Sequence, residues 1–479
     1  MAEEVWMLQT KKADFKQIGA RFRIDPVTAR IIRNRGIEGE AAIDRYLNGT
    51  LDDLYDPMLL KDMERAVSIL CEAVDTGKKI RIVGDYDIDG VCSTYILLQA
   101  FERLGSDVDF EIPDRIKDGY GINESIIEQA HADGVEVILT CDNGISAFHQ
   151  VELAKKYGMT VVITDHHEVP LDGEKEKIPP ADAVIDPKQA DCPYPFPEIC
   201  GAVVAYKLVQ VLYARRGVPQ MEWLDLLEFA AIATVGDVMK LQDENRILVK
   251  YGLKKMAQTK NLGLRRLAEK NNLDLGAITA YHIGFVIGPC LNAGGRLKTA
   301  KEALALLRAQ SEEEAERLAE ELKELNDTRK DMTEQGTEAA KLQVESWYQK
   351  DKVLVVFLPE CHESLAGIIA GRLREYYQKP AIVLTRGEEA VKGSGRSIDE
   401  YHMFKKLTEV SDLLLKFGGH PLAAGLSLEE KNIDEFRRRL NEKCGADGGK
   451  IFKAKVWIDV PMPVGYVTER LVRELSCLE

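Results

Sequence analysis

The chain has 479 residues, and its 64 Lys and Arg against 79 Asp and Glu give a net charge of −15. Hydrophobic residues make up 45% and charged residues 30% of the composition, which excludes a mainly disordered chain. No apolar run reaches the roughly 18–20 residues that span a bilayer, and the N-terminus lacks a signal-peptide pattern, so we expect a cytoplasmic protein without membrane contact. The nine cysteines include no CxxC pair, which argues against a disulfide framework and against a thiolate zinc site.

The chain begins with residues 1–75, whose helical spacing predicts an N-terminal helical extension. From residue 76 the pattern changes to short β-branched runs that alternate with helix-like stretches. This alternation is typical of βαβ units and predicts a mainly parallel sheet flanked by helices, followed by a mostly helical region that ends near residue 310. The predicted strands lie at 80–83, 108–112, 135–139, 160–163 and 181–185.

Residues 311–348 are rich in Glu, Ala, Leu and Lys, contain no Pro and predict one long linker helix. We predict a second, smaller α/β domain at 349–445, again with a mainly parallel sheet flanked by helices, and a cleft between the two domains. The expected elements of this domain are strands at 353–357 and 381–384 with a helix at 365–377. The remaining segment, 446–479, begins with a strand-like run at 452–458.

Three of the predicted strands are followed by acidic or histidine clusters. Because the carboxyl ends of parallel strands meet at one edge of a sheet, these clusters should converge in space. Each cluster alone is also explained by helix caps or structural histidines, but their joint occurrence favours a metal site. Carboxylates with one or two imidazoles suit Mn²⁺ or Mg²⁺, and two such ions can promote hydrolysis of a phosphate ester. The clusters are Asp85, Asp87 and Asp89, then Asp142, then Asp165, His166 and His167.

Four motifs resemble those of the DHH phosphoesterase superfamily, in the same order: DYDIDG (85–90), CDNGIS (141–146), ITDHHE (163–168) and TVGDVM (234–239). Within that superfamily the chain resembles the RecJ single-strand-specific exonucleases over residues 20–479. Supporting stretches are 114–123, 186–196, 200–208, 236–246 and 288–297, and the stretches 367–373, 392–398 and 417–428 resemble the associated DHHA1 substrate-binding domain. The resemblance implies a DHH catalytic domain at 76–310 and the truncated β start of an OB-fold at 446–479.

The resemblance also implies roles for individual residues. The implied metal ligands are Asp87, Asp89, Asp142, His166 and Asp237, with Asp142 as the bridging carboxylate. His167 is expected to face the scissile phosphate, Asp85 to be a ligand or to orient one, and Asp165 to orient the histidines. By itself Asp237 would be explained as a helix cap, so only the resemblance points to it.

A second set of residues is expected to bind the substrate. Arg396, Ser397, Gly418, Gly419 and His420 have the chemistry of a phosphate site, because glycines allow close backbone approach and arginine donates two hydrogen bonds. Asn292 and Arg296, in the stretch GPCLNAGGRL, are implied as further contacts. Cys290 stands in this stretch where the family commonly has a basic residue.

The local charge differs from the net charge. Residues 245–301 contain eleven basic and two acidic residues, a local net charge of +9, whereas the linker segment 311–345 contains five basic and twelve acidic residues. We expect the basic stretch to form a groove that follows a nucleic-acid backbone. Its few aromatic residues, Tyr251, Tyr281 and Phe285, make base stacking a weaker expectation.

Together these features predict a metal-dependent single-stranded DNA exonuclease that uses two divalent ions. The resemblance implies hydrolysis from 5′ to 3′, release of mononucleotides, a role in DNA recombination and repair, and a single-strand-binding protein and a helicase as partners. One alternative is a DHH phosphodiesterase that acts on short oligonucleotides or cyclic dinucleotides. The other is a non-catalytic nucleic-acid-binding scaffold, which the full set of ligand types disfavours.

Overall fold

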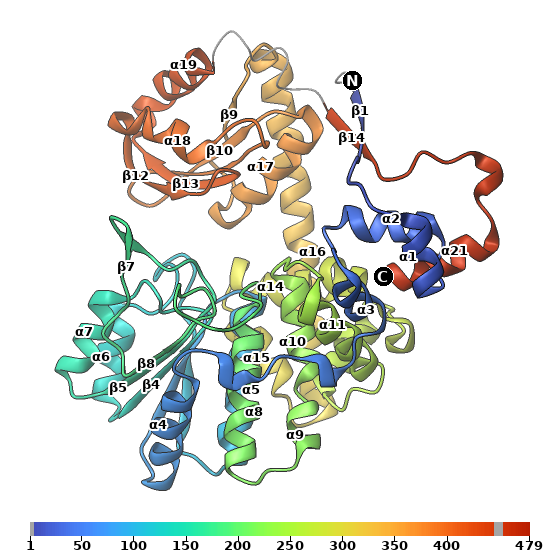
Figure 1. Cartoon of the computed structure of the whole chain (residues 1–479). Helices are drawn as coiled ribbons and strands as arrows, with labels where there is room; N and C mark the ends of the chain where they lie inside the picture. Colours follow the sequence, from blue (N-terminus) through green and yellow to red (C-terminus); the bar gives the residue numbers. More distant parts are fainter. Residues whose placement is uncertain (1–3, 445–453) are drawn as a thin grey trace. The chain divides into compact units, whose positions relative to one another are not determined.

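Figure 1 shows a computed structural model of the chain, which describes residues 4–444 and 454–479. The chain forms two compact units. The large unit contains residues 35–326 with the segments 19–25 and 469–479, and the small unit contains residues 327–468 with segments that precede residue 35. Within the described residues, no helix combines the length and the apolar character needed to cross a membrane.

The large unit is built around a five-stranded sheet with the order β3-β2-β4-β5-β8, in which all neighbouring strands are parallel. Its central strands are short, β-branched and buried, as expected for a parallel sheet covered on both faces. The predicted parallel sheet is confirmed here, with strand ends shifted by one or two residues. The strands are β2 (Ile80–Val83), β3 (Val108–Glu111), β4 (Val137–Cys141), β5 (Thr160–Thr164) and β8 (Ala183–Ile185), with a small hairpin of β6 (Leu171–Asp172) and β7 (Lys175–Glu176) before β8.

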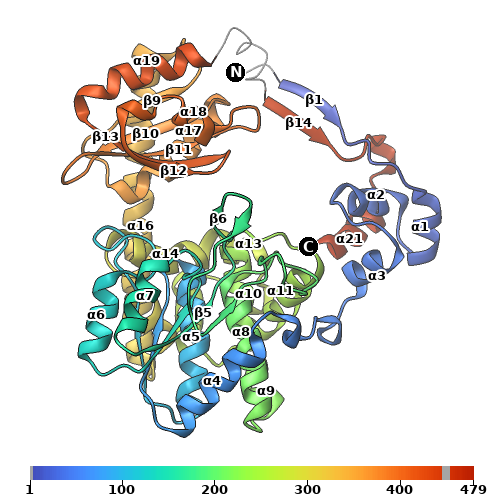
Figure 2. The same ribbon diagram turned by 60° about the vertical axis from the view of Figure 1, so that its left-hand side comes forward.

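Helices cover both faces of this sheet (Figure 2). Successive strand residues point to opposite faces, so Val83 and Ile138 enter one core while Ile82 and Leu139 enter the other. The first core packs against α6 (Glu124–Ala132) and α7 (Phe148–Lys156), and the second, larger core packs against α4 (Met63–Asp75), α5 (Ile88–Arg103), α8 (Gly201–Arg215) and α10 (Leu227–Gly236). This three-layer arrangement gathers the loops after β2, β4 and β5 at the carboxyl edge of the sheet.

The region from 199 to 310 is mostly helical, and the linker helix is present, as predicted. The linker helix α16 (Glu312–Gln343) continues into a π-helical turn (Val344–Tyr348), and a second π-helical turn (Ile283–Ile287) joins α13 to α14. The other helices before α16 are α1 (Phe15–Phe22), α2 (Pro26–Asn34), α3 (Glu40–Asn48), α9 (Gln220–Leu224), α11 (Asp243–Met256), α12 (Leu262–Lys270), α13 (Ala280–His282), α14 (Gly288–Leu297) and α15 (Lys301–Leu307).

The small unit contains a five-stranded sheet with the order β12-β13-β11-β10-β9. Only the pair of β9 and β10 is parallel, so the prediction of a mainly parallel sheet is wrong for this unit. The reason is local: tight turns join β10 to β11 and β12 to β13, and a tight turn can only connect antiparallel strands. The elements are β9 (Leu354–Phe357), α17 (Glu363–Tyr377), β10 (Ala381–Arg386), β11 (Val391–Arg396), α18 (Met403–Thr408), β12 (Leu414–Gly419), β13 (Ala423–Leu428) and α19 (Ile433–Lys443).

The segment predicted to start an OB-fold contributes one strand, β14 (Ala454–Ile458), which pairs in parallel with β1 (Glu4–Leu8). The first two residues of the predicted strand, and the expected boundary at 445–446, lie outside the described residues. After β14 the described chain forms a short helix, α21 (Glu469–Leu475), so the OB-fold stays a prediction. Strand β1 lies within the segment predicted to be helical, and no local pattern indicates it, because its strand partner β14 is far away along the chain.

Candidate metal centre and phosphate-binding residues

The loop after β2 brings three aspartates to the carboxyl edge of the large sheet. Asp85 is fully buried, and Asp87 caps α5 by accepting hydrogen bonds from the amides of Asp89 and Gly90 at 3.0 and 3.1 Å. A glycine is required at position 90 because a Cβ atom there would lie 2.4 Å from the Asp85 carbonyl oxygen. The motif therefore forms a sharp helix start that presents three carboxylates within one turn.

Asp89 is held by the start of α8, a distant segment of the chain. Its two carboxylate oxygens accept hydrogen bonds from the amides of Gly201 and Ala202, both at 2.7 Å. The positive end of the helix dipole thus faces the carboxylate. Gly201 also touches Asp142, because a Cβ atom on this glycine would lie 2.7 Å from the Cβ atom of Asp142. No motif in the sequence points to this role of Gly201, whose only visible sign is its place at the start of a long apolar helix.

Asp142 lies at the centre of the candidate metal site. It adopts a left-handed backbone conformation with φ of 61°, and its Oδ1 lies 3.0 Å from Nε2 of His166. The same nitrogen is 3.4 Å from Asp89 and 3.9 Å from Asp237, which ends α10. Three sets of potential ligand atoms lie within 4.8 Å of one another: Asp85, Asp87 and Asp142; Asp142, His166 and His167; and Asp89, His166 and Asp237. Asp142 and His166 each belong to two sets, so the sets overlap as two adjacent ions would require.

Burial and mutual repulsion raise the pKa values of these carboxylates. The pKa values of Asp85 and Asp237 are each raised to about 8, by burial first and then by neighbouring aspartates. The pKa of Asp142 is raised well above its usual range by the same two causes, and the pKa of Asp87 is raised as well. Burial lowers the pKa of His166, which favours the neutral imidazole that can offer a lone pair to a metal.

The donor set fits divalent cations. The Oδ2 atom of Asp85 is buried and has no hydrogen-bond partner among the described residues, an arrangement that is costly without a compensating positive charge. Carboxylate oxygens with an imidazole are ligands of Mn²⁺ and Mg²⁺, and two such ions would remove the repulsion that raises the pKa values. All five predicted ligands lie in this cluster, and Asp85 joins them.

His167 lies on the exposed side of the cluster, with 43% of its side chain accessible. Its Nδ1 is 2.8 Å from Asp165, whose other oxygen accepts the amide of Ile145, so the buried Asp165 orients the ring as expected. Burial acts to lower the pKa of His167, but the hydrogen bond and charge of Asp165 outweigh it and raise the pKa to about 9. The hydroxyl of Tyr120 donates to the Asp142 carbonyl at 2.8 Å and contacts the same ring. Sequence analysis assigned no role to Tyr120.

Arg296 and Asn292 lie on α14, beside the loop that carries the aspartates. A Cβ atom on the intervening Gly295 would lie 2.3 Å from the carbonyl oxygen of Tyr86, so α14 packs directly on the DYDIDG loop. The pKa of Tyr86 is raised to about 12 by burial and by Asp85, and the positive charge of Arg296 acts against this rise. Asn292 is half-buried on the same helix. Both predicted contacts therefore belong to a helix that touches the metal-binding loop.

Cys290, which replaces a basic residue of the family pattern, is fully buried. Its thiol lies 3.3 Å from the side-chain nitrogen of Asn326 and contacts Asn271. The cysteine thus packs α14 against α16 and the end of α12. A charged side chain buried at this place would lose its hydration, which is unfavourable without a partner of opposite charge.

In the small unit, Arg396 and Ser394 project from the same face of β11, because strand residues two apart share a face. Nη1 of Arg396 donates to the Ser394 hydroxyl at 3.2 Å. Gly367 of α17 lies against both, since a Cβ atom there would be 2.9 Å from each side chain. Ser394 was missed by sequence analysis in favour of Ser397. The hydroxyl of Ser397 is buried and donates to the Tyr401 carbonyl, so it supports the loop that follows β11.

A row of glycines forms the open surface next to these side chains. Gly418 pairs with Gly425, which in turn pairs with Ser394 on the next strand. A Cβ atom at Gly418 or Gly425 would meet no atom within 4 Å, so a ligand can approach the backbone closely. Gly419 has φ of 148° and begins the turn that presents the exposed side chain of His420. The small unit thus offers an arginine, a serine and a histidine around a glycine floor.

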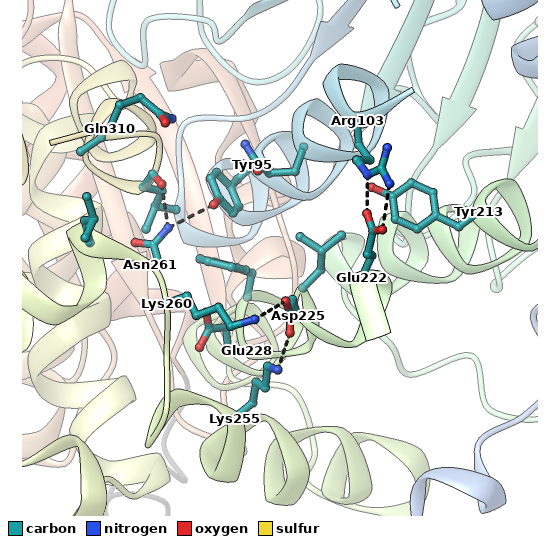
Figure 3. Close-up of a pocket in the computed structure, with 16 residues that line it drawn as sticks. Tyr95, Arg103, Tyr213, Glu222, Asp225, Glu228, Lys255, Lys260, Asn261 and Gln310 are labelled. Carbon is teal, nitrogen blue, oxygen red and sulfur yellow. Dashed lines mark hydrogen bonds and ion pairs between the residues drawn. The ribbon is translucent and has the colours of Figure 1, made fainter. Parts of the chain in front are cut away.

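The basic stretch at 245–301 is mostly neutralised by ion pairs. Lys255 and Lys260 both pair with Asp225 in the wall of a cavity of about 460 Å³ (Figure 3). The same figure shows Arg103 paired with Glu222 across that wall. The pairs elsewhere in the stretch are Arg265 and Arg266 with Glu312, Lys270 with Glu316 and Glu320, Lys298 with Glu302, and Lys301 with Glu111.

The expected one-signed groove is therefore wrong for most of this stretch. The reason is tertiary: acidic residues from α16 and from other segments fold against the basic ones, and the sequence separates them. Lys250 and Lys254 on α11 are different, because neither makes an ion pair among the described residues. Lys250 and Lys254 thus present positive charge on the surface of α11.

Comparison with known proteins gives two family matches, to the DHH family, N-terminal domain, over residues 79–234 and to the DHHA1 domain over residues 350–446. The single-stranded-DNA-specific exonuclease RecJ of Bacillus subtilis is 38% identical over 440 residues, which cover 91% of this chain and 55% of the relative. The protein of the same name from Escherichia coli is 36% identical and is covered to 74%, with 88% of this chain. The chain therefore spans about half of the first relative and about three quarters of the second.

A crystal structure of RecJ from Thermus thermophilus in complex with Mn²⁺ has the same fold. The TM-score is 0.84 and the sequence identity 29%, over 100% of this chain and 68% of the other. The two family matches and the extent of the similarity to these relatives agree. The chain belongs to the RecJ family of single-stranded-DNA-specific exonucleases.

Proposed function

We propose that the chain is a metal-dependent exonuclease that hydrolyses terminal phosphodiesters of single-stranded DNA. The observation that carries this proposal is the overlap of three sets of potential metal ligands at Asp142 and His166. Two divalent cations a few ångströms apart suit the hydrolysis of a phosphodiester. The activity named for the Bacillus and Escherichia relatives, and the Mn²⁺ in the Thermus structure, support the proposal.

In this proposal Asp87, Asp89, Asp142, His166 and Asp237 would hold Mn²⁺ or Mg²⁺, with Asp142 offering oxygens to two of the ligand sets. When bound, such cations would supply positive charge for activating a water molecule and for stabilising a leaving oxygen. The amides at the start of α8 keep Asp89 in place. Asp85 completes one ligand set.

His167 acts on the substrate rather than on a metal. Asp165 accepts from Nδ1, and the other ring nitrogen, Nε2, lies 3.1 Å from the Tyr120 hydroxyl. The raised pKa of His167, about 9, favours the protonated ring, in which Nε2 carries a proton that can be passed to a phosphate oxygen when substrate replaces Tyr120 as the partner. The Tyr120 hydroxyl lies 3.1 Å from both ring nitrogens and helps to hold the ring in place. His167 would therefore donate a hydrogen bond to the scissile phosphate or a proton to the leaving oxygen.

We assign phosphate binding to residues of both units. Arg396, Ser394, Gly418, Gly419 and His420 supply donors around an open backbone in the small unit. Asn292 and Arg296 supply a second contact beside the metal-binding loop. Ser397 has a supporting role, because its hydroxyl is already bound to a carbonyl oxygen.

Several finer features belong to the same proposal: hydrolysis from 5′ to 3′, release of mononucleotides, a role in recombination and repair, and a cytoplasmic location. We also propose a single-strand-binding protein and a helicase as partners. The proposed domains are an N-terminal extension (1–75), a DHH catalytic domain (76–310), a linker helix (311–348), a DHHA1 substrate-binding domain (349–445) and the start of an OB-fold (446–479).

The decisive experiment is to incubate the purified protein and Mn²⁺ with single-stranded DNA labelled at the 5′ end. We expect early release of the label as a mononucleotide, no reaction in EDTA, and slow or absent attack on blunt duplex DNA. Intact DNA under conditions in which a control nuclease degrades it would refute the proposal. Release of the label only at the end of the reaction would refute the polarity.

Two further measurements address the alternatives. An enzyme for short substrates would cleave dinucleotides or cyclic dinucleotides faster than long strands, whereas we expect long strands to be preferred. A non-catalytic scaffold would bind DNA equally well with Asp142→Ala and would show no cleavage in either form. We expect Asp142→Ala to abolish cleavage and to retain strand binding.

A further inference from the structure

Two aromatic side chains are exposed and stacked on the surface of the large unit. Tyr281 is 64% exposed and Phe285 is 67% exposed, and their ring centroids are 4.8 Å apart with an angle of 28° between the planes. Phe285 lies on the π-helical turn between α13 and α14. Such turns are rare in proteins overall, and many of those that occur lie at functional sites. Adjacent exposed rings are unfavourable in water, which indicates a binding surface.

A cavity of about 740 Å³ opens beside Tyr281. Lys250 lies in its wall and, like its neighbour Lys254, makes no ion pair among the described residues. The pKa of Lys250 is lowered by burial and by the positive charges of Lys254 and Arg246. Four basic side chains, Arg35, Lys240, Arg246 and Lys250, line the cavity together with the acidic Glu479. Lys240 is largely exposed and also lies 3.7 Å from Glu198.

The aromatic pair is connected to the metal centre by a short, packed path. Gly284 lies between the two rings in sequence and contacts α10, since a Cβ atom on it would be 3.6 Å from Cγ1 of Val235. Val235 precedes the proposed ligand Asp237 by two residues, and Lys240 of the cavity wall follows it by three. Three residues of chain span at most about 11 Å. A strand with its end at the metal centre therefore needs only a few nucleotides to reach this surface.

We infer that Tyr281 and Phe285 form a stacking platform for the bases of single-stranded DNA, and that Lys240 and Lys250 in the adjoining cationic cavity contact its phosphates. The inference rests on the proposed exonuclease function and adds a binding site that takes no part in the chemistry. Aromatic rings stack with any base and lysines pair with any phosphate, so this combination holds a strand without regard to sequence. The excess of positive charge favours a polyanion over an apolar protein segment as the occupant.

The platform makes affinity depend on strand length. In this arrangement a dinucleotide occupies the metal centre alone, whereas a longer strand engages both places at once. Loss of the rings should therefore weaken the binding of long strands and leave the cleavage of a dinucleotide unchanged. This length dependence separates the platform from the residues of the metal centre.

The test measures binding of an oligothymidylate of about a dozen nucleotides, a length typical of single-strand sites, by fluorescence anisotropy in EDTA. We expect Tyr281→Ala and Phe285→Ala each to raise the dissociation constant roughly tenfold. Tyr281→Phe keeps the ring and should bind like the wild type. Trp347→Ala is the matched control, because Trp347 is 70% exposed on the other π-helical turn. A 2-aminopurine in the strand should be quenched by the wild type and less by the two alanine variants.

Equal binding by the wild type and both alanine variants would overturn the platform, and so would an equal loss with Trp347→Ala. Slower cleavage of a dinucleotide by the alanine variants in the presence of Mn²⁺ would also overturn it, because the substitutions would then have disturbed the metal centre itself. A wild-type protein that cleaves no DNA would refute the proposed function. The binding comparison in EDTA would still decide the platform, since it requires no cleavage.

Discussion

A Cβ atom on Gly201 would lie 2.7 Å from the Cβ atom of Asp142, so the first residue of α8 and the central carboxylate of the metal site are in direct contact. The amide of the same glycine donates to Asp89 at 2.7 Å. One residue that binds no metal thus sets the position of two proposed ligands. Contacts of this kind usually matter nearly as much as the ligands themselves.

We expect Gly201→Ala to lower Mn²⁺ affinity and cleavage rate by about 10- to 100-fold. The added methyl group would displace Asp142 and distort the hydrogen bonds from the amides of Gly201 and Ala202 to Asp89. Titration of Mn²⁺ by calorimetry and initial cleavage rates would measure the effect. Gly371→Ala is the control, since Gly371 also lies in a helix but a Cβ atom there meets nothing within 4 Å. Unchanged metal affinity in Gly201→Ala would contradict the proposed role of Gly201 in positioning Asp142 and Asp89.

Asp142→Asn should make the metal-free protein more stable while removing its response to metal. The buried carboxylate is repelled by its neighbours, so its charge is unfavourable without cations. We therefore expect the free energy of unfolding in EDTA to rise, because the neutral amide removes a buried charge that its neighbours repel. Thermal unfolding with and without Mn²⁺ would measure both effects.

The control for this experiment is Asp52→Asn, which alters an exposed aspartate and should change neither value. A lower melting temperature of Asp142→Asn in EDTA would show that the carboxylate stabilises the metal-free fold. That outcome would argue against a cluster held together by bound cations.

Glu228 gives the stability of the large unit a pH dependence away from the metal site. Burial raises the pKa of this side chain to about 7, although it accepts a hydrogen bond from Thr259 at 2.7 Å. Since the folded pKa exceeds the ordinary value of 4.5, the folded state holds its proton longer than the unfolded state. The contribution of Glu228 is therefore fully present below pH 4.5 and declines by up to about 3 kcal/mol as the pH rises to about 7.

Glu228→Gln should remove this dependence. Relative to the wild type, the variant should gain stability between pH 5 and pH 8, as measured by urea unfolding at both pH values. A stability difference that is the same at pH 5 and pH 8 would mean that Glu228 does not titrate in this range.

Substitution of a basic residue that makes an ion pair on α12 should affect DNA binding less than substitution of Lys250 on α11, which makes no ion pair among the described residues. Arg266 pairs with Glu312 at 2.8 Å, so Arg266→Gln should cost little stability and leave DNA binding nearly unchanged. Lys250→Gln should instead reduce the slope of log affinity against log salt by about 0.7, the value for one phosphate contact on a single strand. Binding isotherms at several salt concentrations would measure both slopes. Equal slopes for the two variants would contradict the distinction between ion-paired basic residues and those that are available to bind phosphate.

Much of the site could be read from the sequence because its chemistry sits at the ends of strands. Each β-branched run is local, and the residues that follow it, such as Asp142 and His166, are placed by the rule that parallel strands end at one edge. The same locality explains the correct linker helix. It also explains the errors in the small unit, where tight turns around Gly387 and Gly419 reverse the chain and make the sheet mainly antiparallel.

The sequence by itself determined the class of the protein, the parallel sheet of the large unit and the identity of the proposed metal ligands. Only the tertiary structure decided which atoms support them, because Gly201, Tyr120 and Ser394 act through contacts with residues that are distant in the chain or on a neighbouring strand. The distribution of charged residues was likewise predicted only in part from the sequence. A count along the chain separates the basic stretch from the acidic linker, but in the fold α12 and α16 pair their charges. Lys250 and Lys254 stay available to a polyanion on the surface beside Tyr281, because Coulomb interactions depend on distance in space and not on position in the sequence.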